Sequence, residues 1–175
     1  MRKLKNSELE RISVDNFKNS KKTPIIVVLD NVRSALNVGS AFRTSDAFRI
    51  EKIYLCGITS TPPNKEIRKS ALGSTNSVEW EHSEKTEGVV LKLRKEGYLV
   101  CAIEQVSNSV MLNNFKSTEK PLVVVFGNEV NGVQQSVVDL CDVCIEIPQI
   151  GTKHSLNISV SVGVVLWDLF YKVNQ

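Results

Sequence analysis

Short runs of apolar and β-branched residues recur along the chain and predict buried β-strands. Such runs cover residues 24–29, Lys52–Cys56, Tyr98–Ile103, Leu122–Phe126 and Val143–Ile147. Their length suits strands better than helices. Segments with helical patterning lie between them, over Val38–Phe48, Glu84–Glu96 and Val133–Leu140. Strands that alternate with helices in this way predict an α/β domain, with a mostly parallel sheet and helices on both faces.

Three further segments fit this alternation less well. Residues 1–22 pattern as a charged amphipathic helix followed by a polar turn, with Leu4, Leu9, Ile12 and Phe17 as its apolar points. Residues 56–75 form a long excursion that contains a short helical patch over Lys65–Leu72, and such excursions are often functional. The tail Ser155–Val173 alternates like a strand, but its length and its place after a glycine-containing loop suit a helix equally well.

Composition places the chain among ordinary globular domains. Its 175 residues suit one domain, with 42% hydrophobic and 23% charged residues. A net charge of +3 permits a polyanionic partner without requiring one. The start has no apolar signal segment, and no window is long and apolar enough to cross a membrane. We therefore expect a cytoplasmic protein that keeps its four cysteines as thiols.

Several common chemistries lack their motifs here. Cys141 and Cys144 form a C-x-x-C pair, but the other cysteines and both histidines are scattered singly, which favours structural thiols over a metal site. Residues 127–132 have the glycine spacing of a phosphate loop, but Val133 and Gln134 stand where lysine and serine or threonine are required. The sequence contains neither G-x-G-x-x-G nor G-x-S-x-G, so dinucleotide and serine-hydrolase readings lose their support.

The candidate chemistry lies in three loops that adjoin apolar strands, at residues 30–46, 126–132 and 147–157. Each loop carries small residues and side-chain amides. Ligands of open parallel sheets bind at the carboxyl edge, where such loops meet. Gly127 and Gly151 allow the backbone to approach a ligand closely. Turn formation and helix capping explain any one loop alone, whereas all three together favour a binding site.

The same loops resemble the three motifs of the SpoU/TrmH branch of the SPOUT superfamily of RNA methyltransferases. The motifs read NVGSAFRTSDAF at 37–48, VVVFGNEVNGV at 123–133 and IEIPQIGTKHSLNISVS at 145–161. They stand in the family's order, and the resemblance covers the chain from Pro24 onward. It implies a 2′-O-ribose methyltransferase that uses S-adenosylmethionine and acts on RNA, either tRNA or rRNA, with no metal.

The resemblance also implies features of the fold that local patterning does not show. The C-terminal third is expected to form a deep trefoil knot, a rare feature among proteins. The tail Ser155–Val173 is then expected to be a helix. Members of the family are typically homodimers whose site is completed across the interface. The implied organisation is an N-terminal helical extension at 1–22 and a methyltransferase domain at 23–175.

The resemblance assigns two sets of site residues. The catalytic set is Asn37, Arg43, Glu129, Ser155 and Asn157, and the cofactor-binding set is Glu104, Gln105, Gly127, Ile147 and Leu156. In the family, Arg43 corresponds to the residue proposed to activate the 2′-hydroxyl. A guanidinium is a poor base, because its pKa exceeds about 12. A grip on the adjacent phosphate is therefore the physically easier role for Arg43.

Two other functions remain open from the sequence. A non-catalytic RNA-binding or assembly protein could keep the same knotted scaffold, although it has no need for all five catalytic residues. A base-methylating enzyme of the same superfamily is the other alternative, and the first motif with Arg43 favours ribose methylation over it. The basic residues of the N-terminal segment and of 56–75 are candidate RNA contacts, or else solvated surface.

Overall fold

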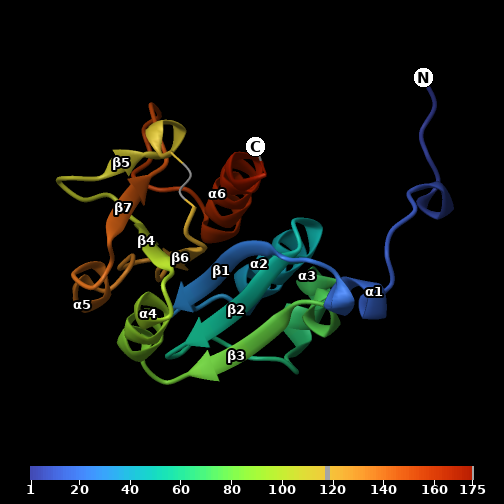
Figure 1. The fold of residues 1–175 in the computed structure, drawn as a ribbon, viewed down its shortest axis with the longest axis horizontal. Helices are drawn as coiled ribbons and strands as arrows, with labels where there is room; N and C mark the ends of the chain where they lie inside the picture. Colours follow the sequence, from blue (N-terminus) through green and yellow to red (C-terminus); the bar gives the residue numbers. More distant parts are fainter. Residues whose placement is uncertain (117–118, 175) are drawn as a thin grey trace.

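A seven-stranded sheet lies at the centre of the computed structural model, which describes residues 1–116 and 119–174 (Figure 1). The order across the sheet is β3-β2-β1-β6-β4-β7-β5, and every recorded strand pairing is parallel. The strands are β1 (Thr23–Asp30), β2 (Ile50–Cys56), β3 (Glu79–Ser83), β4 (Leu99–Ile103), β5 (Val110–Met111), β6 (Leu122–Phe126) and β7 (Val143–Glu146).

Helices cover both faces of this sheet, as the sequence pattern predicts. The α-helices are α1 (Val14–Asn19), α2 (Ala35–Ala47), α3 (Lys65–Ala71), α4 (Thr86–Lys95), α5 (Gln135–Val138) and α6 (Ile158–Val173), and short 3-10 turns are η1 (Asn6–Glu8), η2 (Ser74–Asn76) and η3 (Leu112–Asn114). Along β1, Val27 packs with α2, α3 and α6 in one hydrophobic cluster. Its neighbours Ile26 and Val28 pack with α4 and α5 in the other. A strand buried on both faces needs an uninterrupted apolar run, which is what β1 has.

Strand β3 has no counterpart in the sequence pattern. It reads Glu79-Trp-Glu-His-Ser and lies at one edge of the sheet, where Glu79, Glu81 and His82 are exposed. Its register with β2 is supported by Lys52, whose Nζ lies 3.0 Å from Glu79 and 2.9 Å from Glu81. A polar edge strand lacks the apolar run that reveals a buried one, so only the pairing identifies it.

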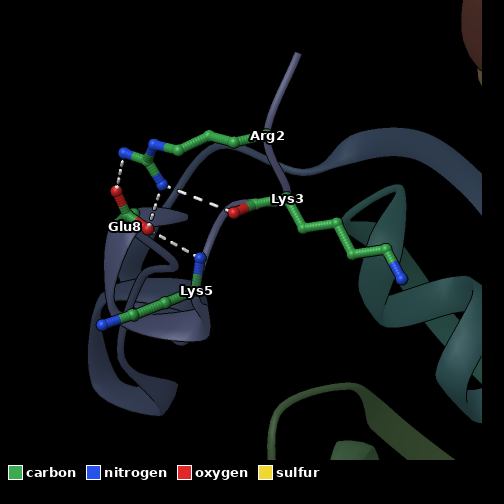
Figure 2. A network of polar contacts seen from close by, with 4 residues as sticks. All are labelled: Arg2, Lys3, Lys5 and Glu8. Carbon is green, nitrogen blue, oxygen red and sulfur yellow. Dashed lines mark hydrogen bonds and ion pairs between the residues drawn. The ribbon is translucent and has the colours of Figure 1, made fainter.

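The N-terminal segment contains less helix than the sequence pattern predicts. In place of one helix it has the short η1 and α1, and the part before α1 runs away from the sheet (Figure 1). Glu8 accepts hydrogen bonds from the Arg2 guanidinium and from the Lys5 backbone, which holds η1 together without burying anything (Figure 2). Only Phe17 is buried, so Leu4, Leu9 and Ile12 lack the packing that would stabilise a longer helix.

The C-terminal tail is a helix, which confirms what the resemblance implies and settles the ambiguity of its pattern. Its buried residues are Ile158, Val162, Val165, Leu166 and Leu169, a spacing that fits a helix face. The alternating valines place a second apolar stripe on the exposed side, and that stripe produced the strand-like period. None of the described helices is long and apolar enough to cross a membrane.

Candidate active site

A cleft of 520 Å³, here called the sheet-edge cleft, opens where β4, β6 and β7 end. The carboxyl ends of these parallel strands meet there, together with the loops that follow them. Eight of the ten residues that the resemblance assigns to the site line it: Glu104, Gln105, Gly127, Glu129, Ile147, Ser155, Leu156 and Asn157. The structure therefore brings together loops that are distant in the sequence.

The loop after β6 folds back on itself to form one wall of the cleft. Asn128 and Gly132 form an antiparallel bridge, with both backbone N···O distances at 2.9 Å. This turn brings the backbone of Gly132 and Val133 against Gly127. A Cβ atom on Gly127 would lie 2.0 Å from the Gly132 carbonyl carbon, a distance that no side chain tolerates. Gly127 is thus required by the turn itself.

Glu129 joins this loop to the start of α2. Its carboxylate accepts hydrogen bonds from the backbone nitrogens of Arg33 at 2.8 Å and Ser34 at 2.9 Å. Asn37 Nδ2 donates a third at 3.0 Å. Partial burial alone would raise the pKa of Glu129, but these hydrogen bonds outweigh it and hold the pKa below its usual value. The residue is therefore held as a carboxylate that anchors the loop.

Asn157 brings the third motif to the same point. Its Oδ1 accepts from the backbone nitrogen of Ser159 at 2.9 Å and so caps the N-terminus of α6. Its Nδ2 donates to Asn37 Oδ1 at 3.4 Å. Asn37 consequently bonds Glu129 with one end of its amide and Asn157 with the other, and all three motifs meet in one junction at the mouth of the cleft.

Glu104 and Gln105 brace the loops around the cleft. Glu104 accepts from the backbone nitrogens of Gln105 at 2.8 Å and Val133 at 2.9 Å. Gln105 Nε2 donates to the carbonyl oxygen of His154 at 2.9 Å. Both residues line the cleft, as expected, while also tying β4 to the loops before α5 and α6.

The structure does not bring Arg43 into the sheet-edge cleft. Arg43 is exposed on α2, six residues after Asn37. At about 3.6 residues per turn, that spacing places it on a different face and about 9 Å further along the helix. Ser155, by contrast, is exposed in the loop that lines the cleft. Within one chain, then, four of the five expected catalytic residues gather and the fifth points elsewhere.

Asp30 is a site-supporting residue that the sequence reasoning did not single out. It is fully buried at the end of β1. Its carboxylate accepts from Thr86 Oγ1, from Asn31 Nδ2 at 2.9 Å and from the backbone nitrogen of Gln134 at 3.1 Å. It thereby fixes the loop after β6 against α4. An aspartate that directly ends a buried apolar strand was the signal for it.

The C-x-x-C pair shows the chemistry of structural thiols. Burial raises the pKa of Cys141 to about 12, and its Sγ donates to the carbonyl oxygen of Val137 at 3.2 Å. Across the described parts of the chain, no three histidine, cysteine or acidic side chains are grouped closely enough to hold a metal ion.

Comparison with known proteins places this site in a family. A profile of the SpoU rRNA methylase family matches residues 24–167. The tRNA (guanosine(18)-2′-O)-methyltransferase of Aquifex aeolicus is 32% identical over 149 residues, which are 82% of this chain and 67% of that protein. Across the first curated relatives that it matches, the chain spans about two thirds of their length or less.

Solved structures agree with the sequence match. The A. aeolicus TrmH/SpoU tRNA modifying enzyme superposes with a TM-score of 0.81 at 27% identity, covering 92% of this chain and 82% of that one. The AdoMet-bound rRNA methyltransferase of Sinorhizobium meliloti superposes with a TM-score of 0.78 at 28% identity, covering 87% and 58%. With the three motifs joined at one cleft and the family profile matching most of its length, the chain belongs to the SpoU rRNA methylase family.

Proposed function

We propose that this chain transfers a methyl group from S-adenosylmethionine to a ribose 2′-hydroxyl of tRNA or rRNA. The observation that carries the proposal is the junction of Asn37, Glu129 and Asn157 at the mouth of the sheet-edge cleft. Relatives in the family are named as guanosine 2′-O-methyltransferases of tRNA and of 23S rRNA. We propose that the chain acts in the cytoplasm, a location consistent with the tRNA and rRNA named for these relatives.

The sheet-edge cleft fits S-adenosylmethionine in size and in chemistry. Its 520 Å³ lies within the usual range of small-molecule sites, about 300–1,000 Å³. Phe126, Ile145 and Ile147 supply apolar walls for a purine ring. Glu104 and Glu129 give the lining negative charge, which suits a positively charged sulfonium. We propose that the cofactor is bound by Glu104, Gln105, Gly127, Ile147 and Leu156.

The chain's own residues would act mainly by positioning. When bound, S-adenosylmethionine supplies an electrophilic methyl carbon. Ser155 and Asn157 orient the ribose at the cleft mouth, and Asn37 keeps Asn157 aligned against Glu129. Arg43 would bind the phosphate next to the target ribose, and its charge would favour loss of the 2′-hydroxyl proton to solvent as that oxygen accepts the methyl group.

We further propose that a second copy of the chain completes this site. Arg43 is remote from the cleft of its own chain, and α6 exposes an apolar stripe beside α2. The stripe consists of Val160, Val164, Trp167 and Tyr171, with exposed fractions of 50%, 39%, 60% and 59%. Apolar side chains at this helical spacing are typical of a helix that packs against a partner. A homodimer on this face would bring Arg43 of one copy toward the cleft of the other.

The proposal includes the domain organisation that the family resemblance implies. Residues 23–175 would form the methyltransferase domain, with the trefoil knot in its C-terminal third, and residues 1–22 would be an extension in front of it. The fold superposes on those of the relatives, while the threading of the knot stays a prediction.

Mass spectrometry of nucleosides tests the proposed activity. RNA from cells that lack the gene is incubated with purified protein and S-adenosylmethionine, with tRNA and rRNA kept separate. We expect one 2′-O-methylated nucleoside to be absent from the deletion strain and to return after incubation. A base-methylated product would favour the base-methylating alternative. RNA binding without any methylated product would favour the non-catalytic one.

A further inference from the structure

A second cavity, here called the Trp80 cavity, lies at the β3 edge of the molecule. It has a volume of 650 Å³ and is lined by α3, the segment before it, η2 and Trp80 of β3. It shares no lining residue with the sheet-edge cleft. In Figure 1, α3 and β3 lie toward one edge of the sheet, while β7 and β5 form the other. The Trp80 cavity is therefore a separate site and not an extension of the first.

The charge of the Trp80 cavity suits an anion. Lys65 and Arg68 of α3 line it and are both exposed, and neither has an ion-pair partner within the described ranges. The lining contains no carboxylate, whereas the sheet-edge cleft has three. The nearest acidic residue along β3, Glu79, is paired with Lys52 at 3.0 Å. Two free cations on the wall of a cavity are suited to phosphate oxygens.

Other lining residues of the cavity supply an apolar surface. Trp80 is half-buried and packs against the core, which holds its ring in place. Pro62 and Pro63 add rigid apolar surface to the wall. Nucleic acid bases stack on such a fixed aromatic ring, and stacking of this kind is tolerant of sequence. A ligand that offers only negative charge would gain nothing from this apolar surface, whereas a nucleotide offers both a base and a phosphate.

Asn64 adds a hydrogen-bonding group to the lining. Its Oδ1 accepts from the backbone nitrogens of Glu66 at 2.9 Å and Ile67 at 3.3 Å, which fixes the direction of its amide. Its Nδ2 has no recorded partner among the described residues and can donate to a base edge or a ribose oxygen. The cavity therefore combines a stacking ring, a fixed donor and two cations.

We propose that the Trp80 cavity binds one unpaired nucleotide of the RNA, with its base against Trp80 and its phosphate near Lys65 and Arg68. The identification of that RNA as the substrate rests on the proposed function. Binding in the cavity does not require methyl transfer, so it can be measured by itself. A remote contact of this kind would help select the RNA while the chemistry takes place in the sheet-edge cleft.

Tryptophan fluorescence tests the stacking directly. The chain has two tryptophans, so Trp167→Phe leaves Trp80 as the only one. We expect a short single-stranded oligoadenylate to quench Trp80 fluorescence to saturation. Polyglutamate, which has charge but no bases, should leave it unchanged. Equal quenching by polyglutamate would mean that the cavity binds acidic polymers, including acidic protein segments, and would overturn the proposal, as would no quenching by the oligoadenylate.

Charge variants provide a second test that does not disturb the core. Lys65→Gln with Arg68→Gln should weaken binding of the oligoadenylate by about tenfold and reduce the slope of log affinity against log salt by about 1.4, since each contact with a single strand contributes about 0.7. The control is Lys85→Gln with Lys95→Gln, two exposed lysines outside both cavities, which should bind as wild type does. An equal loss in both double variants would show a diffuse effect of charge and overturn the proposal.

Trp80 variants separate stacking from folding. Trp80→Leu should weaken binding about 5- to 100-fold, and Trp80→Phe should restore most of it. If Trp80→Leu binds as wild type does while its thermal unfolding is normal, the proposal fails. Methyl transfer and binding of S-adenosylmethionine are measured on the same variants. Nucleotide binding without any methyl transfer would contradict the proposed function alone, whereas normal Trp80 variants in an active enzyme would contradict this inference alone.

Discussion

At the scale of single residues, Asn37 links the second and third motifs at the site. It hydrogen-bonds both Glu129 and Asn157, at 3.0 Å and 3.4 Å. An amide is needed there because one contact requires a donor and the other an acceptor. An aspartate has the same shape but only acceptors, and it would face the carboxylate of Glu129.

Asn37→Asp should therefore lower kcat/KM for RNA methylation about tenfold to a hundredfold. The loss corresponds to one hydrogen bond to a charged group, about 1.5–3 kcal/mol. Steady-state kinetics with the RNA substrate measure it. Asn19→Asp, the same change at an exposed position of α1, is the matched control. If Asn37→Asp and Asn19→Asp had equal values of kcat/KM, Asn37 would have no role in the reaction.

Arg43→Lys tests the role of the guanidinium. A lysine keeps the charge but loses the two-pronged grip on phosphate. We expect activity to fall at least about a hundredfold, while calorimetry shows unchanged binding of S-adenosylmethionine, because Arg43 does not line the cleft. Arg94→Lys, the same change at an exposed position of α4, serves as the control. Near wild-type turnover by Arg43→Lys would contradict both proposed roles of Arg43, activation of the 2′-hydroxyl and the grip on the adjacent phosphate.

Glu129 links the site to pH. Hydrogen bonds hold its folded-state pKa below the ordinary value of 4.5. The unfolded chain therefore binds more protons in the interval between the two values, and stability rises with pH there. The stabilisation is fully present above about pH 4.5 and is lost as the pH falls through the folded-state pKa. The free energy of unfolding of wild type should exceed that of Glu129→Gln at pH 7, and the difference should shrink below pH 4.5. A constant difference would contradict this.

At the scale of elements, α6 is apolar on two sides for two different reasons. One side packs on the sheet through Val162, Val165 and Leu166. The other exposes the stripe of Val160, Val164, Trp167 and Tyr171. Exposing such an apolar stripe to water is unfavourable in a single chain, and burial against a partner removes that exposure. Its place beside α2, which carries Arg43, connects the proposed dimer to the proposed chemistry.

Charges on this stripe should dissociate the dimer without unfolding the chain. Val164→Glu with Tyr171→Glu is expected to weaken self-association at least about tenfold, because burying two carboxylates without partners is costly. Sedimentation equilibrium measures the association, and circular dichroism checks the fold. Leu91→Glu, which alters an exposed apolar residue of α4, should leave it unchanged. A wild-type chain that stays monomeric would contradict the proposed dimer.

At the scale of the whole molecule, the sheet separates two hydrophobic clusters, and each contains a buried thiol. Cys101 lies in the cluster beneath α2 and α6, and Cys56 lies in the one beneath α4. Burial raises the pKa of both thiols to about 12. Both are therefore neutral at pH 8, where reaction requires the thiolate.

Thiol labelling should follow this division. In the native protein at pH 8, Cys56 and Cys101 should stay unmodified by iodoacetamide, as mapped by mass spectrometry of peptides. After unfolding in guanidinium, all four cysteines should react. Fast native labelling of Cys56 or Cys101 would show that the clusters open far more readily than their packing indicates.

The sequence by itself determined the alternation of strands and helices, because burial on both faces requires continuous apolar runs such as those of β1 and β6. It also placed the three candidate loops, because strand ends are visible where apolar runs stop at polar residues. The motif residues then followed from the resemblance. Local pattern failed where burial is partial: β3 is a polar edge strand, and the N-terminal segment lacks a surface to pack on.

Tertiary structure alone decided which residues meet. Asn37 contacts residues 92 and 120 positions further along the chain, and no periodicity reports such a pairing. It also decided that α6 is a helix, since packing of one face on the sheet outweighs the strand preference of its valines. The separation of Arg43 from the cleft follows from helix geometry together with where α2 is anchored. Secondary structure depends on local burial, whereas the site depends on contacts that only the folded chain creates.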